Sequence, residues 1–228
     1  MKTKLTDVFF DLDHTLWDFD KNSELTFNTI FINNLPDVDA KLFIDKYVPI
    51  NQECWKLYQF DKITHEELRY NRLKHSFDAI NYFISDAQIN KISDEYIRLL
   101  PDNNHLFEGT IEILEYLKPK YNLHIITNGF ADVQSRKIYN AKIENYFQTV
   151  TNSEMAGVKK PNPEIFNYAL SRANAAVATS IMIGDSYDAD VLGAINAGLD
   201  AIYFNESKVN VDKNIKQVNN LLELKNFL

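Results

Sequence analysis

Two aspartates stand two residues apart in Phe9-Phe10-Asp11-Leu12-Asp13, directly after a short apolar run. A carboxylate can attack phosphorus as a nucleophile, and a second carboxylate close by can donate a proton and later remove one. A simple acidic turn or a helix cap contains the same residue types, so the pair alone leaves both readings open. Asp11 is therefore a candidate nucleophile, and Asp13 is a candidate general acid and base.

Two further segments offer groups that could bind a phosphate. The segment Thr127-Asn128-Gly129 combines a hydroxyl, an amide and a glycine-freed backbone, all of which could bind non-bridging phosphate oxygens. The segment Lys159-Lys160-Pro161 places lysines just before a helix start, where an ammonium could hold a phosphate and offset acidic charge. Taken alone, the first also fits a strand-to-helix turn, and the second fits a solvated lysine before a proline-started helix.

An acidic segment follows, with Asp185, Asp188 and Asp190 inside Gly184-Asp185-Ser186-Tyr187-Asp188-Ala189-Asp190. Helix capping explains one aspartate of such a cluster but does not readily explain three. Oxygen ligands are those that a hard cation prefers, and magnesium is the natural candidate near a phosphate. The cluster therefore predicts a metal site.

Short apolar runs come directly before most of these polar groups, and helical patterns lie between the runs. Each run is too short for a helix and nearly continuous in apolar character, which is typical of a strand buried on both faces. The predicted strands are 7–10, 123–126, 180–183 and 201–204, with a weaker candidate at 149–151. The predicted helices between them are 109–117, 163–172 and 189–197, the last ending at Gly198. This alternation predicts an α/β fold with a doubly wound parallel sheet, whose strand ends bring the polar groups together.

The stretch from about residue 20 to 100 breaks this rhythm. It shows helical periodicity without a buried-strand candidate, which predicts about four helices inserted after the first strand. The sequence thus predicts an α/β core domain at 1–16 and 101–228, and a helical domain at 17–100.

Bulk properties restrict the class of protein. The 228 residues are 45% hydrophobic and 25% charged, as in a globular protein, and the net charge of −8 argues against binding to polymeric nucleic acid. Cys54 is the only cysteine, so neither an internal disulfide nor a cysteine-rich zinc site is expected. The chain lacks a signal-peptide pattern and any apolar run of roughly 18 residues, so we expect a cytoplasmic protein without membrane contact.

In their order along the chain, the four motifs resemble those of the haloacid dehalogenase-like hydrolase superfamily. The resemblance implies Asp11 as nucleophile, Asp13 as general acid and base, and Thr127 as the hydroxyl of the second motif. It also implies Lys160 as the catalytic lysine of the third motif. In the fourth motif it implies Asp185 as a direct magnesium ligand, with Asp190 assisting from the outer shell. The implied fold is a Rossmann-like core with an inserted α-helical cap domain.

Within the superfamily, the chain resembles the bacterial pyrimidine 5′-nucleotidases, through the segments 125–130, 157–162 and 195–199. This resemblance implies an Mg²⁺-dependent hydrolysis of small phosphomonoesters, nucleoside monophosphates among them, through an aspartyl-phosphate. The metal would be held by Asp11, Asp185 and the main-chain carbonyl of Asp13. Thr127, Asn128, Gly129 and Lys160 would bind the phosphate.

Three alternatives stay open. A sugar-phosphate phosphatase or phosphomutase would share all four motifs. A haloacid dehalogenase would share the nucleophile, but it needs neither Asp13 nor the acidic fourth motif, and both therefore count against it. A catalytically silent phosphate-binding protein would be expected to lack one of the motifs. The oligomeric state has no signal in the sequence.

Overall fold

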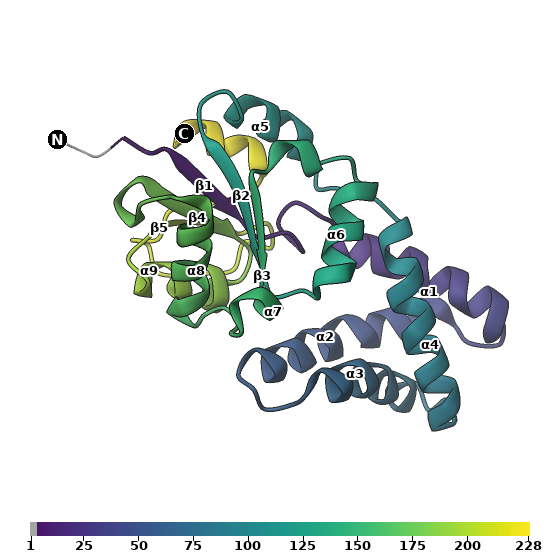
Figure 1. Cartoon of the computed structure of the whole chain (residues 1–228). Coiled ribbons are helices and arrows are strands. Elements are labelled where there is room, and N and C mark those ends of the chain that lie inside the picture. Colours follow the sequence, from purple (N-terminus) through teal and green to yellow (C-terminus); the bar gives the residue numbers. More distant parts are fainter. Residues whose placement is uncertain (1–3) are drawn as a thin grey trace. The chain divides into compact units, whose positions relative to one another are not determined.

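The computed structural model describes residues 4–228 and contains one six-stranded sheet with the strand order β3-β2-β1-β4-β5-β6 (Figure 1). Every neighbouring pair of strands is parallel. The strands are β1 (Asp7–Phe10), β2 (Asn122–Thr127), β3 (Thr149–Asn152), β4 (Ser180–Gly184), β5 (Asp200–Phe204) and β6 (Gln217–Val218). The predicted doubly wound parallel sheet is confirmed. Only β6 has no counterpart in the prediction, because two residues are too few to show a pattern.

The central strand β1 is buried along its whole length, which explains its continuous apolar character. Its Phe9 belongs to a core cluster that also includes Met182 of β4, Phe166 of α8 (Pro163–Ala173) and Ala194 of α9 (Gly193–Asn196). Figure 1 shows α8 and α9 beside β4. The apolar side chains of these helices thus fix one face of the sheet.

The segment after β4 differs from the predicted helix 189–197. The chain forms a π-helical turn over Tyr187–Leu192 before α9 begins. The N–H of Val191 donates to the carbonyl of Ser186, five residues earlier, while the Asp190 carboxylate accepts the Ser186 N–H. A hydrogen bond that spans five residues in this way is the one that defines a π-helical turn. Gly198 follows with a φ of 88°, as expected for the residue that ends the helix.

Three further helices complete this part of the chain: α5 (Thr110–Leu117), α6 (Ala131–Asn140) and α7 (Ser153–Ala156). The sequence predicts α5 but not α6. Helix α6 buries two polar side chains, Gln134 and Lys137, together with Val133 and Ile138. Its inner face is therefore half polar, and an apolar periodicity cannot reveal it.

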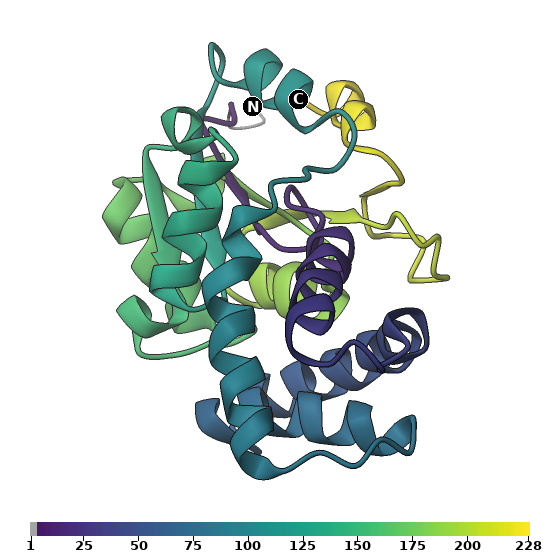
Figure 2. The same cartoon turned by 90° about the vertical axis from the view of Figure 1, so that its right-hand side faces the viewer.

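Contacts divide the chain into two compact units, one containing the described residues up to Asp18 together with Asn104–Leu228, the other Phe19–Asn103. Residues 1–3 of the predicted core domain lie outside the described part of the chain. The second unit consists of helices, as both views show (Figures 1 and 2). They are α1 (Phe19–Asn34), α2 (Ala40–Gln59), α3 (His65–Ala79) and α4 (Asp86–Leu99). The assignment of these units as core and cap domains stays a prediction.

Aromatic rings fill the interior of the second unit. Phe27 stacks on Tyr96 of α4 and meets Phe43 of α2 edge to face, at centroid distances of 4.6 and 5.0 Å. Capping boxes start α3 at Thr64 and α4 at Ser85, so each helix begins with its first N–H groups paired. Across residues 4–228, none of the helices is both long and apolar enough to span a bilayer.

Candidate active site

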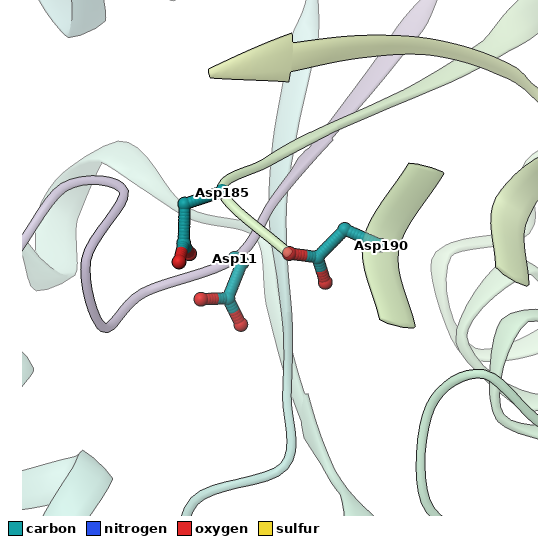
Figure 3. Close-up of side chains that lie close together, drawn as sticks. All are labelled: Asp11, Asp185 and Asp190. Carbon is teal, nitrogen blue, oxygen red and sulfur yellow. The ribbon is translucent and has the colours of Figure 1, made fainter. Parts of the chain in front are cut away.

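The carboxyl ends of the central strands bring three aspartates together. Asp11 follows β1, Asp185 follows β4, and Asp190 lies in the π-helical turn after β4 (Figure 3). Each offers a carboxylate oxygen, and these oxygens all lie within 4.8 Å of one another. Strands β1 and β4 are neighbours at the point where the strand order reverses, which is where open α/β sheets bind ligands.

Not all three aspartates of the acidic segment 184–190 belong to this cluster. Asp188 is exposed and does not belong to the cluster. It lies on the outer side of the π-helical turn, whereas Asp190 is buried. The third carboxylate comes from Asp11, which lies far away in the sequence. Of the three aspartates in the acidic segment, only Asp185 and Asp190 thus belong to the group of carboxylates that could hold a metal ion.

Lys160 is buried against this cluster. Its Nζ donates to Asp11 Oδ1 at 2.5 Å, to Asp190 Oδ1 at 2.6 Å and to the carbonyl of Ile126 at 2.8 Å. An ammonium has three hydrogens, so these three acceptors use all of them. Lys160 thus connects the ends of β1 and β2 with the turn after β4.

Asn128 holds the main chain of Lys160 in place. Its side-chain oxygen accepts the Lys160 N–H at 2.8 Å, and its side-chain nitrogen donates to the Lys160 carbonyl at 3.0 Å. The amide therefore positions the lysine through both of its polar atoms. The predicted contacts of Asn128 and Gly129 with a phosphate stay predictions.

When all three carboxylates are ionised, one ammonium leaves two negative charges in excess in the cluster. Burial raises the pKa of Asp11 well above its ordinary value; Lys160 opposes this, while Asp190 and Asp185 add to it. Burial, with Asp190, raises the pKa of Asp185 to about 8. Burial lowers the pKa of the Lys160 ammonium, but Asp11 and Asp190 outweigh it and the pKa lies above its ordinary value. Lys160 alone therefore does not neutralise the three carboxylates of the cluster.

Thr15 and Gly184 set the positions of two carboxylates. Thr15 Oγ1 donates to Asp185 Oδ1 and accepts the Asp185 N–H, both at 3.0 Å. Thr15 lies inside the first motif, but the sequence gives no signal for this contact with the fourth. At Gly184, an added Cβ would lie 2.2 Å from Asp190 Oδ2, so the glycine makes room for that carboxylate.

We expect Gly184→Ala to destabilise the protein by about 1–3 kcal/mol, because the new methyl group displaces the Asp190 carboxylate from its packed position. Urea denaturation would measure the free energy of unfolding. Gly157→Ala is the control, since a Cβ there meets no atom within 4 Å and only the φ of 72° opposes it. An unchanged midpoint for Gly184→Ala would contradict the packing argument.

Asp13 lies beside α6 rather than among the three clustered aspartates. Its Oδ1 accepts from Lys137 Nζ at 2.6 Å, and its Oδ2 accepts from the side-chain nitrogen of Gln134 at 2.9 Å. Gln134 also donates to Thr127 Oγ1 at 2.7 Å. Neither Gln134 nor Lys137 is among the predicted site residues, because nothing in the pattern of α6 marks them as buried.

An open parallel sheet with an acidic cluster at its switch point defines the chain as an α/β protein with a candidate ligand site beyond its strand ends. The haloacid dehalogenase-like hydrolase family matches residues 8–198. The chain belongs to this family, and the predicted resemblance is confirmed.

Several known proteins are similar to this chain. The chain is 31% identical to the pyrimidine 5′-nucleotidase YjjG of Escherichia coli, with 87% of this chain and 85% of that protein covered. It is 30% identical to the pyrimidine 5′-nucleotidase PynA of Streptococcus pneumoniae, with 87% and 83% covered. A crystal structure of the putative HAD-hydrolase YfnB of Bacillus subtilis, bound to magnesium, superposes with a TM-score of 0.87, at 26% identity and 99% coverage of both chains.

Proposed function

We propose that this chain is an Mg²⁺-dependent phosphomonoesterase that works through an aspartyl-phosphate on Asp11. The observation that carries the proposal is the contact of Asp11 with Lys160 beside Asp185 and Asp190, at the end of the central strand. A carboxylate held next to an ammonium and a candidate metal site can receive a phosphoryl group whose charge is neutralised on both sides.

The donor set fits a hard divalent cation. The excess of two negative charges in the fully ionised cluster equals the charge that such a cation brings, and carboxylate oxygens are its preferred ligands. Asp11, Asp185 and the main-chain carbonyl of Asp13 would hold the ion. Asp190 would assist from the outer shell, because its two oxygens already accept from Lys160 and from the Ser186 N–H. When bound, Mg²⁺ screens the repulsion between the nucleophile and a phosphate dianion.

The side chains of this chain supply the remaining steps. A carboxylate oxygen of Asp11 attacks phosphorus and the bond from phosphorus to the leaving oxygen breaks, while protonated Asp13 gives its proton to that oxygen. Asp13 then takes a proton from water, which attacks the phosphorus of the aspartyl-phosphate and releases inorganic phosphate. Thr127 and Asn128 are the proposed donors to the phosphate oxygens as their charge changes, and the Lys160 ammonium acts on these oxygens through its charge. Gly129 supports this loop through its N–H, which donates to Thr127 Oγ1.

Nucleoside monophosphates are the proposed substrates, on the similarity to two pyrimidine 5′-nucleotidases. The helical unit Phe19–Asn103 is proposed as the cap domain, inserted in an otherwise continuous core. A small phosphomonoester as partner and a cytoplasmic location complete the proposal. Sugar phosphates are the second substrate class, because they share the reacting phosphomonoester.

We expect phosphate release from pyrimidine nucleoside monophosphates that depends on Mg²⁺. A screen of nucleotides and sugar phosphates, with Mg²⁺ or with EDTA, would measure it. Chelation should reduce turnover by about 10³-fold or more, because two uncompensated charges in the cluster would then repel the phosphate. Turnover that persists without a divalent metal would contradict the metal site, and a preference for sugar phosphates would replace the nucleotide assignment.

A further inference from the structure

Helix α6 presents two buried polar side chains to Asp13. Gln134 and Lys137 lie three residues apart and therefore on one face of the helix. Their exposed fractions are 1% and 2%, so both have given up nearly all contact with water. Burying an amide and an ammonium is unfavourable unless specific partners compensate it, so the partners on this face indicate what the two residues do.

Lys137 contacts Asp13 and Trp17, in and just after the first motif. Its Nζ donates to Asp13 Oδ1 at 2.6 Å and lies 4.3 Å from the centre of the Trp17 ring. Trp17 is itself fully buried, and the ring face attracts the ammonium. The lysine is therefore held on the ring with its charge directed at one oxygen of Asp13.

Gln134 connects Asp13 with Thr127. Its side-chain nitrogen must be the atom that faces Asp13, because a carboxylate only accepts, and its two hydrogens go to Asp13 Oδ2 and Thr127 Oγ1. The Gly129 N–H also donates to Thr127 Oγ1, at 3.1 Å. The hydroxyl oxygen thus accepts twice, which leaves its own hydrogen free to point to a third group.

Gly129 makes this arrangement possible. A Cβ at this position would lie 2.4 Å from the side-chain nitrogen and the amide carbon of Gln134. Any other residue at 129 would push Gln134 off both Asp13 and Thr127. The glycine of the second motif therefore has a packing role toward α6.

We propose that Gln134 and Lys137 are positioning residues for the reaction, acting through Asp13 and Thr127. Each holds a different oxygen of Asp13, which fixes the plane of the carboxylate while leaving one lone pair on each oxygen for proton transfer. Gln134 also orients the Thr127 hydroxyl so that it donates toward the phosphate. The inference rests on the proposed function, since it assigns Asp13 the proton transfers.

The test compares Lys137→Met with wild type on two substrates, a nucleoside monophosphate and p-nitrophenyl phosphate. The value of kcat/KM covers the steps up to loss of the leaving group, and nitrophenolate leaves without needing a proton. We expect kcat/KM to fall on the order of 10- to 100-fold for the nucleotide and much less for p-nitrophenyl phosphate. Lys137→Arg, which keeps a charged donor, should recover part of the loss.

The same substitution in an Asp13→Asn background gives the second readout. If Lys137 acts through Asp13, Lys137→Met should lower kcat/KM of the Asp13→Asn protein by no more than about twofold, because the carboxylate that Lys137 positions is already absent. Gln134→Met should keep part of its effect in that background, since it also acts through Thr127. Ser135→Ala on the same helix is the control; its hydroxyl donates to the Ala131 carbonyl, and wild-type kinetics are expected.

Equal losses on both substrates, repeated in the Asp13→Asn background, would overturn the inference and make Lys137 a purely structural ion pair. Should Lys137→Met fail to fold in thermal unfolding, Lys137→Gln, which keeps a donor without the charge, provides the same comparison. Failure of the proposed function looks different: wild type would release no phosphate, or Asp11→Asn would still release it. Turnover that needs Asp11 and Asp13 but not Lys137 would contradict this inference alone.

Discussion

Asp11→Asn abolishes phosphate release while the protein remains folded: this is the largest effect on activity that we expect. An amide nitrogen or oxygen does not displace the leaving group from phosphorus, so no aspartyl-phosphate forms and turnover should fall by roughly 10⁴-fold or more. The fold should tolerate the change, because asparagine has the same shape and its side-chain oxygen can still accept from Lys160.

The stability of this variant gives an independent check. Burial raises the pKa of Asp11, with Asp190 and Asp185 adding to the effect of burial, so an uncharged side chain is favoured at this position. Without metal, Asp11→Asn should therefore melt at or above the wild-type temperature. Phosphate release and thermal unfolding would be measured on the same preparation.

Asp188→Asn is the matched control for Asp11→Asn. It makes the same chemical change in the acidic segment, but at an exposed residue outside the cluster. Its turnover and melting temperature should equal those of wild type. Near wild-type activity of Asp11→Asn would rule out the aspartyl-phosphate mechanism, whereas a loss of activity accompanied by unfolding would leave the chemistry to be tested by trapping the phosphoenzyme in wild type.

The sheet could be predicted because its strands are buried on both faces and appear as short apolar runs. Asp11 and Asp185 come directly after two such runs, and parallel strands end at the same edge, so their proximity follows from the strand pattern alone. Asp190 is different. Its place in the cluster depends on a π-helical turn and on the missing Cβ of Gly184, neither of which leaves a periodic signal.

Gln134 and Lys137 could not be predicted, for a similar reason. Their burial depends on the space beside Gly129 and on the ring of Trp17. Gly129 lies in the turn between β2 and α6, and Trp17 lies far away in the sequence, near the N-terminus. A helix whose buried face is half polar has no clear apolar stripe. The sequence predicts Gly129 as a phosphate-binding backbone position, and the room it leaves for Gln134 is visible only in three dimensions.

Lys160→Met should produce the second large effect, on stability as well as on turnover. The substitution keeps the length of the side chain but removes the ammonium that pairs with Asp11 and Asp190. Breaking a buried pair by removing one partner costs about 3–5 kcal/mol, because the remaining charges are left uncompensated. Turnover should fall on the order of 10²- to 10³-fold, since the positive charge beside the nucleophile Asp11 and the developing phosphate charge is lost.

Lys159→Met is the matched control, because it makes the same chemical change directly beside Lys160, whose ammonium donates to Asp11 and Asp190. Urea denaturation without metal would measure the free energy of unfolding of both variants, and phosphate release would measure turnover. A Lys159→Met variant as impaired as Lys160→Met would show that general loss of charge, rather than the buried pairs, causes the effect.

The pH dependence of the Lys160→Met defect follows from the same cluster. The Asp185 carboxyl ionises near its ordinary pKa of 3.8 in the unfolded chain and, because of burial and Asp190, at about 8 in the fold. The folded state therefore binds more protons between these values, and the stability of the metal-free protein falls as the pH rises through that range. Without Lys160 the repulsion among the three carboxylates is stronger, so the stability difference between Lys160→Met and wild type should be larger at pH 8 than at pH 5.

Added Mg²⁺ should reduce this stability difference at pH 8, because the ion binds the folded state and neutralises the same carboxylates. A difference that is independent of both pH and Mg²⁺ would mean that the lost stability comes from packing of the side chain and not from its charge.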